Sequence, residues 1–136
     1  ELKENPSLIE NAVEEFLRYE SPTQMTARVA SEDIEIHQTT IKKGDQVYIL
    51  LGAANRDPNT FACAHLLDIT RNPNPHLAFG YGTHFCLGAP LARLEAQIAI
   101  QTFLQQVDNP RLASFDLQWR KLMGFRSLNE LPITFD

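Results

Sequence analysis

The sequence is poor in several features that would assign it to a specialised class of protein. Only two of its 136 residues are cysteine, Cys63 and Cys86, so there is no disulfide framework, and the chain fits a reducing, cytoplasmic setting. No apolar run approaches the roughly 20 residues of a membrane span, and the start lacks a signal-peptide pattern. Acidic residues outnumber basic ones by 17 to 12. The resulting net charge of −5 argues against a protein that binds nucleic acid or anionic membranes.

Nothing in the sequence divides it into parts. There is no internal repeat, no low-complexity tract and no glycine–serine linker. With 43% hydrophobic and 21% charged residues, the composition is that of a soluble globular protein. Because the chain opens on Glu1 and not on methionine, we expect it to begin inside a longer protein. Residues 1–136 are therefore interpreted as a single, partial domain.

Two segments have the apolar periodicity of helices. The first begins at Asn5-Pro6, a capping side chain followed by a proline at the first helical position, and ends near Glu20. The second begins near Pro90 and runs to Val107. Its apolar residues lie on more than one side, so we expect this helix to be buried between several partners.

Shorter patterns indicate small β-sheets. Ile34 and Ile36 alternate with polar residues, which predicts a half-buried strand, and residues 47–51 predict a buried one. We expect these two strands to pair as a hairpin-like sheet. A short helix is predicted over 52–57, a long irregular loop over 57–75, and short strands and turns over 117–135. The fold class is thus mainly α with small β-sheets, or α+β by its elements.

The segment from Phe79 to Gly88 is the most informative part of the sequence. Cys86 lies just before a helix start, where unpaired N–H groups favour an anion and so stabilise a thiolate. The flanking Gly82 and Gly88 permit close backbone approach and unusual dihedral angles. Together they can hold a sulfur bare on one side and surrounded by amides on the other, as a soft metal ligand requires. Phe79 offers a flat apolar wall for a planar ligand.

Two other interpretations of Cys86 remain open from the residues alone. It can be a small buried core residue in a glycine-bearing turn. It can also belong to a zinc site with Cys63, His65 and His84, although the C-x-H and H-x-C spacings are tighter than those common in such sites.

The pattern Phe79-x-x-Gly82-x-x-x-Cys86-x-Gly88 resembles the haem-binding signature of the cytochrome P450 family at all four defining positions. The run from Ala89 to Glu95 is typical of soluble bacterial members. Glu15-x-x-Arg18 looks like the K-helix motif of the family, and residues 55–58 and 68–73 look like its connection between sheet and haem loop. These elements follow the family's order over essentially the whole chain. The resemblance implies the C-terminal, haem-binding part of the cytochrome P450 fold.

The resemblance also implies a cofactor and roles for particular residues. The cofactor is haem b (iron protoporphyrin IX), with Cys86 as the axial thiolate on iron and hence the catalytic and metal-binding residue. The other residues implied to bind the cofactor are the propionate-binding Arg28 and His84, together with Phe79, Gly82 and Gly88. A guanidinium pairs well with a carboxylate, which agrees with this role for Arg28.

The family also implies a structural network of Glu15, Arg18 and Arg71, which fixes the haem loop to the first helix. Taken alone, Glu15 and Arg18 are one more surface pair at i,i+3 spacing.

The implied activity is that of a haem-thiolate monooxygenase, which inserts one oxygen atom of O2 into a small apolar organic substrate. A ferredoxin- or flavoprotein-type donor would supply electrons at the proximal face, where Arg93 is a candidate contact or else a solvated helix residue. Thr23–Ala27 and Leu122–Phe125 are candidate substrate contacts or ordinary strand and turn residues. The N-terminal portion of the same fold, with its proton-delivering helix, is absent. The alternative is a truncated or remnant haem-binding segment without turnover.

The sequence departs from the family pattern at two places. Residues 61–65 stand where the family is usually rich in proline and acidic residues, so Cys63 is interpreted as an incidental thiol. Ser127 stands where glycine is usual, and it would be strained if that position required a positive φ angle.

Overall fold

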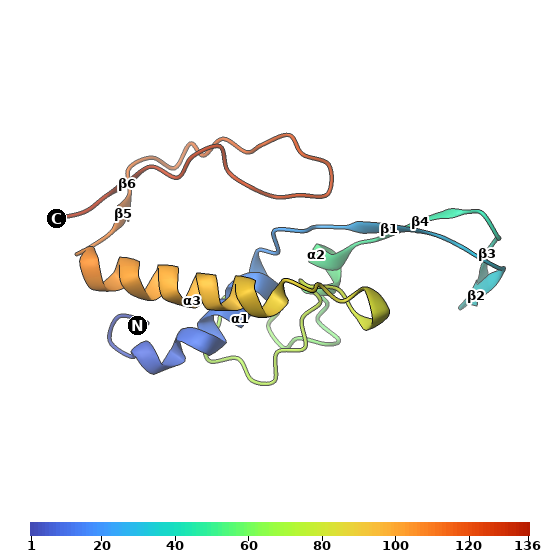
Figure 1. The fold of residues 1–136 in the computed structure, drawn as a ribbon, viewed down its shortest axis with the longest axis horizontal. Helices are drawn as coiled ribbons and strands as arrows, with labels where there is room; N and C mark the ends of the chain where they lie inside the picture. Colours follow the sequence, from blue (N-terminus) through green and yellow to red (C-terminus); the bar gives the residue numbers. More distant parts are fainter.

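A computed structural model describes residues 1–136 and shows two helices side by side, with small two-stranded sheets around them (Figure 1). The helices, including two short 3-10 turns, are η1 (Pro6–Leu8), α1 (Ile9–Tyr19), α2 (Leu51–Ala54), η2 (Gly82–His84) and α3 (Ala89–Gln106). The strands are β1 (Thr26–Val29), β2 (Ile34–Ile36), β3 (Thr39–Ile41), β4 (Gln46–Ile49), β5 (Arg111–Leu112) and β6 (Ile133–Thr134). The predicted mixture of helices and small sheets is confirmed. None of the helices combines the length and the apolar character needed to span a membrane.

The first predicted helix is confirmed in its extent but not in its cap. A 3-10 turn starts at Pro6 and continues into α1, which ends at Tyr19. The side chain of Asn5 makes no capping hydrogen bond to the helix. Its Oδ1 accepts a hydrogen bond from Ser7 Oγ at 2.6 Å instead, so the expected capping role is wrong.

The second predicted helix is also confirmed, but most of its apolar surface is not buried by other parts of the chain. α3 packs against α1, and Ala89 is its one fully buried residue. Leu91, Leu94 and Ile98 keep 60%, 52% and 55% of their surface exposed. The partners that the apolar pattern requires on these sides are therefore not among residues 1–136.

The predicted strand pairing is wrong. β4 pairs antiparallel with β1, with Thr26 opposite Ile49, and β2 pairs antiparallel with β3. A two-residue turn at His37-Gln38 lets the chain fold back at once, so the backbone groups of β2 find partners locally. All of β2 and most of β4 are exposed, so the expected burial of these strands is absent as well.

The connection from α2 to η2 contains no helix or strand, which confirms the long irregular loop. After α3 the chain runs back along the molecule and returns to the end of α1 (Figure 1). There the Gln24 N–H donates to the Gly124 carbonyl at 2.7 Å. Gly124 has φ +77°, and a Cβ at this position would lie 3.4 Å from Met25 Cγ, so both backbone and space favour glycine.

Cys63, not Ser127, has the strained backbone. Cys63 has φ +50°, whereas Ser127 is not among the residues with positive φ. We expect Cys63→Gly to stabilise the chain by about 1 kcal/mol, because the left-handed region is unfavourable for residues with a Cβ. Cys63→Ala keeps the Cβ and is expected to change stability little. Urea unfolding of the three chains measures both effects, and equal midpoints for Cys63→Gly and Cys63→Ala would contradict the assignment of strain.

Candidate functional site

One cavity of about 300 Å³ gathers four of the residues predicted to bind a cofactor. Arg28 from β1, Phe79, His84 from η2 and Cys86 all line it. Leu17 of α1 and Leu51 of α2 contribute apolar wall. The cavity therefore brings together segments that are far apart in the sequence, and it combines a sulfur, an aromatic ring and two side chains able to donate hydrogen bonds.

Backbone hydrogen bonds shape the loop that carries Cys86. The Cys86 N–H donates to the Phe79 carbonyl at 2.9 Å, and the Ala89 N–H donates to the Cys86 carbonyl at 3.2 Å. Gly82 has φ +73°, with free space where a Cβ would be, so glycine is needed there for the dihedral angle alone. Gly88 is different, because its φ is −81°. The expected unusual dihedral angle is therefore wrong for Gly88. A Cβ on Gly88 would lie 3.9 Å from Cys86 Sγ, which is an ordinary van der Waals contact.

The sulfur of Cys86 is free and exposed. No N–H group donates a hydrogen bond to it, so the expected surround of amides is not formed. The exposure contradicts the alternative of a buried core cysteine. The zinc alternative is also wrong, because Cys63, His65, His84 and Cys86 do not come together: no group of three or more histidine, cysteine, aspartate or glutamate side chains could hold a metal ion.

Arg28 and His84 present hydrogen-bond donors at the cavity wall. Arg28 uses Nη1 to donate to Thr26 Oγ1 at 3.0 Å and to the Ala27 carbonyl at 2.8 Å, which leaves its Nε and Nη2 without a protein partner. His84 has no hydrogen-bond partner and is exposed at the end of η2. Free donors beside an apolar wall and a soft sulfur suit a flat ligand that carries carboxylates. The residues of the cavity thus fit haem.

The three residues of the predicted structural network meet beneath the irregular loop. The side chains of Glu15 and Arg18 are fully buried, and two parallel hydrogen bonds of 2.8 Å join them. The remaining N–H groups of Arg18 donate to three backbone carbonyls, at 2.8 to 3.0 Å. These carbonyls belong to Asn55, Ala64 and Leu66. All five donors of the guanidinium are therefore satisfied, and the alternative of an exposed surface pair is wrong.

Arg71 completes this network from the other side of Glu15. Its Nε lies 3.1 and 3.2 Å from the two carboxylate oxygens, and its Nη1 donates to the Ala62 carbonyl at 2.9 Å. The Asp68 N–H and the Asn74 side-chain amide also donate to Glu15. Burial alone would raise the pKa of the Glu15 carboxyl, but the hydrogen bonds from Arg18, Asp68 and Arg71 outweigh burial and lower it.

Arg93 pairs with a carboxylate of α1, which contradicts one of the two roles expected for it. Its Nε and Nη2 donate to the two carboxylate oxygens of Glu14 at 2.6 and 2.9 Å, and its guanidinium lies 4.7 Å from the centre of the Phe79 ring. It is therefore not a solvated helix residue. A contact with an electron donor stays a prediction, and such a contact would compete with Glu14 for the same guanidinium.

Sequence reasoning missed His76. Its side chain is only 3% exposed, and its Nε2 lies 3.0 Å from a Glu14 carboxylate oxygen. A lone histidine in a loop of asparagine and proline gives no signal of this contact, because Glu14 lies 62 residues earlier in the chain.

The segments proposed to contact substrate lie next to each other. Thr23 and Thr26 line the cavity with Cys86, and Thr23 forms an isolated β-bridge with Phe125. Their role toward a substrate stays a prediction.

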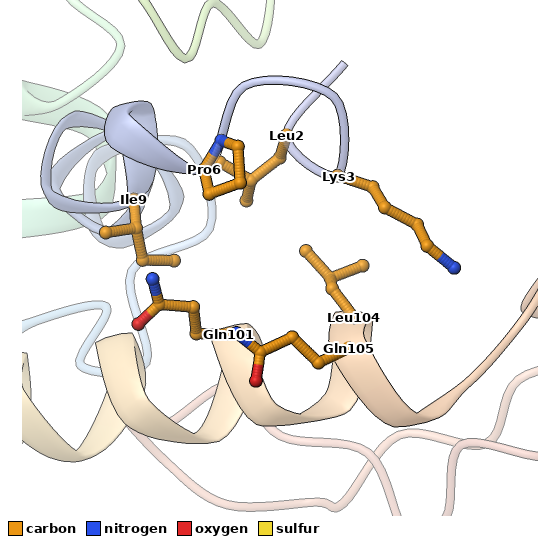
Figure 2. Close-up of a pocket in the computed structure, with 7 residues that line it drawn as sticks. All are labelled: Leu2, Lys3, Pro6, Ile9, Gln101, Leu104 and Gln105. Carbon is orange, nitrogen blue, oxygen red and sulfur yellow. The ribbon is translucent and has the colours of Figure 1, made fainter.

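A second, smaller pocket of about 40 Å³ lies between the start of the chain and α3 (Figure 2). It shares no lining residue with the Cys86 cavity. Its one charged side chain, Lys3, pairs with Asp108 at 2.6 Å. We do not assign this pocket to the functional site, because it lacks a reactive group.

Comparison with known proteins agrees with the sequence motifs. The profile of the family described as Cytochrome P450 matches residues 4–108. The biotin biosynthesis cytochrome P450 of Bacillus subtilis (strain 168) is 65% identical over 135 residues, which cover 99% of this chain and 34% of that protein. The polyketide biosynthesis cytochrome P450 PksS of the same strain is 49% identical over 136 residues, or 98% of this chain and 34% of that protein. The chain thus spans about a third of the length of these relatives.

The crystal structure of P450BioI in complex with hexadec-9Z-enoic acid ligated acyl carrier protein superimposes with a TM-score of 0.96 and 64% sequence identity. The match covers 99% of this chain and 35% of that one. The elements described above therefore form part of a larger known fold.

Proposed function

The chain belongs to the cytochrome P450 family, and from this we propose that it carries the haem-thiolate site of a monooxygenase. The observation that supports the proposal best is the meeting of Cys86, Phe79, Arg28 and His84 on one cavity. Haem held by these residues would supply the activation of dioxygen: with two electrons from a donor and two protons, one oxygen atom would enter an apolar organic substrate and the other would leave as water.

In this proposal each residue of the cavity has a distinct task. Cys86 supplies the sulfur ligand, which is accessible because the residue is exposed and forms no disulfide. Phe79 forms an apolar wall, and Gly82 and Gly88 shape the loop around the cofactor. The free donors of Arg28 and the ring of His84 bind the propionates. Arg28 keeps Nε and Nη2 for this purpose, because its Nη1 already binds Thr26 and Ala27.

Glu15, Arg18 and Arg71 have a structural task. They connect α1 with the irregular loop and hold its backbone by hydrogen bonds from two guanidinium groups. Because all three lie outside the cavity lining, we assign them no chemistry. Cys63 has no part in the site.

The partners follow from the same proposal. A ferredoxin- or flavoprotein-type donor supplies electrons, and the rest of the fold covers the cofactor. The substrate is apolar, and the 64% identity to P450BioI supports a long acyl chain presented by an acyl carrier protein. The two free thiols support a cytoplasmic location.

A second candidate is a haem-binding segment without turnover. The observation behind it is that the chain spans only about a third of its relatives and leaves α3 residues such as Leu91 exposed. Haem bound to this chain alone would be open to water, which favours loss of reduced oxygen over oxidation of a substrate.

The proposal is tested by the reduced, carbon-monoxide-bound difference spectrum. Two proteins are measured after haem reconstitution: the chain itself, and a hybrid in which the chain replaces the matching third of the Bacillus subtilis biotin biosynthesis cytochrome P450. We expect the strongly red-shifted Soret band of thiolate-ligated haem in the hybrid. A folded, haem-loaded hybrid without this band would overturn the proposal. A hybrid with the band but no oxygenated product from a carrier-bound fatty acyl substrate would favour the second candidate.

A further inference from the structure

Outside the cavity, the Glu14 carboxylate binds the side chains of His76 and Arg93, and both of these side chains lie next to Phe79 or its neighbour Ala78. Glu14 precedes the buried Glu15 on α1, and its carboxylate binds Arg93 of α3 through two hydrogen bonds of 2.6 and 2.9 Å. The same carboxylate lies 3.0 Å from His76 Nε2. The Glu14 side chain is 28% exposed, so water screens it only in part. Glu14 therefore connects both long helices with the loop that precedes the cavity.

His76 extends this connection to the backbone beside Phe79. Its Nδ1 accepts a hydrogen bond from the Ala78 N–H at 3.2 Å, so that nitrogen carries no proton. The proton of the neutral ring is then on Nε2, which donates it to Glu14. The neutral imidazole thus bridges a carboxylate on α1 and the amide of the residue before Phe79.

Arg93 reaches Phe79 from the other side. Its guanidinium lies over the Phe79 ring at 4.7 Å, while two of its nitrogens bind Glu14. The Phe79 carbonyl in turn accepts the hydrogen bond from the Cys86 N–H. A continuous series of contacts therefore leads from Glu14 to the backbone of Cys86.

We infer that Glu14, His76 and Arg93 form a positioning cluster, which fixes Phe79 and through it the loop that presents the Cys86 sulfur. The inference rests on the proposed function, in that Cys86 is taken as the haem ligand. The three residues do not line the cavity, so they act through Phe79 and are not catalytic.

The bridging role of His76 requires a neutral ring. Burial lowers the pKa of His76, and the charge of Arg93 lowers it too, while Glu14 and Glu15 act in the opposite direction. A histidine whose pKa is lowered on folding stabilises the fold above its usual pKa of about 6.5, and this contribution is lost as the pH falls. On protonation Nδ1 becomes a donor, and the Ala78 N–H loses its acceptor.

The test measures hydrogen–deuterium exchange of the Ala78 and Cys86 amides in the hybrid before haem is added. We expect Glu14→Gln to accelerate exchange at both amides by about tenfold, because hydrogen bonds to a charged group are the stronger ones. The matched control is Glu10→Gln, an exposed glutamate on the same helix without a hydrogen bond or ion pair, and it should leave both amides unchanged. If Glu14→Gln does not fold, Arg93→Lys is used, because it keeps the charge but loses the paired hydrogen bonds.

The pH profile separates positioning from general stability. Protection of the Ala78 amide, corrected for intrinsic exchange, should fall below about pH 6.5 in the parent protein. His76→Gln should keep the protection at neutral pH and remove the fall, because glutamine both accepts and donates but does not titrate. His76→Leu should lose the protection at every pH. An identical acid response in the parent and His76→Gln would overturn the role of His76.

The spectrum then connects the cluster to the sulfur. After haem is added, Glu14→Gln should show a smaller share of the thiolate-type band than Glu10→Gln at equal folded protein. Exchange rates that do not respond to Glu14→Gln or Arg93→Lys would overturn the inference while the proposed function stands. If Glu14→Gln accelerates exchange at the two amides but the haem-loaded hybrid shows no thiolate-type band, the proposed function is overturned. The coupling of Glu14 to the Cys86 backbone then still stands.

Discussion

Cys86→Ala is expected to abolish the thiolate-type spectrum of the haem-loaded hybrid completely, without loss of folded protein. Nothing in the chain hydrogen-bonds to the Cys86 sulfur, and the residue is exposed, so its removal leaves no cavity in the core and no unpaired partner. The backbone bond from the Cys86 N–H to the Phe79 carbonyl does not depend on the side chain. The loss is therefore one of ligand chemistry and not of structure.

Cys63→Ala is the matched control for this experiment, since it removes the other thiol and should leave the spectrum unchanged. The measurement is the reduced, carbon-monoxide-bound spectrum at equal haem, with circular dichroism to compare the fold. A thiolate-type band that persists in Cys86→Ala and disappears in Cys63→Ala would show that Cys63, and not Cys86, is the haem ligand.

Arg18→Ala is expected to have the largest effect on stability, a loss of about 3–5 kcal/mol. The substitution removes all five hydrogen bonds of a fully buried guanidinium. It leaves three carbonyls without their donor and the buried Glu15 carboxylate with fewer positive partners. Unpaired charge and unpaired carbonyls in a buried site are both costly.

Urea unfolding of the apo hybrid and the yield of folded haem protein measure this effect. The matched control is Arg111→Ala, which breaks an ion pair with Asp136 whose side chains are 63% and 57% exposed. We expect the control to change stability by about 1 kcal/mol or less. Equal losses for the two variants would show that the buried network does not fix the fold.

The helices were predictable because their signals are local. A proline at the first helical position and a periodic apolar stripe predict α1, and a proline at the start with a long apolar repeat predicts α3. The strand pairing was not predictable in the same way. β1 reads Thr-Ala-Arg-Val, and these four residues are too few for their alternation to indicate a strand by itself. Its pairing with β4 is set by how the chain folds between them.

The same distinction between local and long-range signals applies to the candidate site. The motif around Cys86 is contiguous, so the sequence predicts its loop, and the structure brings Phe79, His84 and Cys86 to one cavity with Arg28. The contacts of Glu14 with His76 and Arg93 span 62 and 79 residues, so no spacing rule could predict them. The alternative of a solvated Arg93 was wrong for this reason, because on its own helix the residue has the pattern of a surface position.

The way in which Arg18 and Arg71 hold the irregular loop has a consequence for its tolerance of substitution. The two guanidinium groups bind this loop through main-chain carbonyls, those of Asn55, Ala62, Ala64 and Leu66. Every amino acid provides a carbonyl, so these contacts place few demands on side-chain identity. Within the run Phe61-Ala62-Cys63-Ala64-His65, the exposed Ala62 and His65 can therefore be replaced without changing the path of the loop, whereas Phe61 and Ala64 are buried and constrained by packing. Such a loop tolerates substitution at its exposed positions, while the two arginines that bind its carbonyls do not.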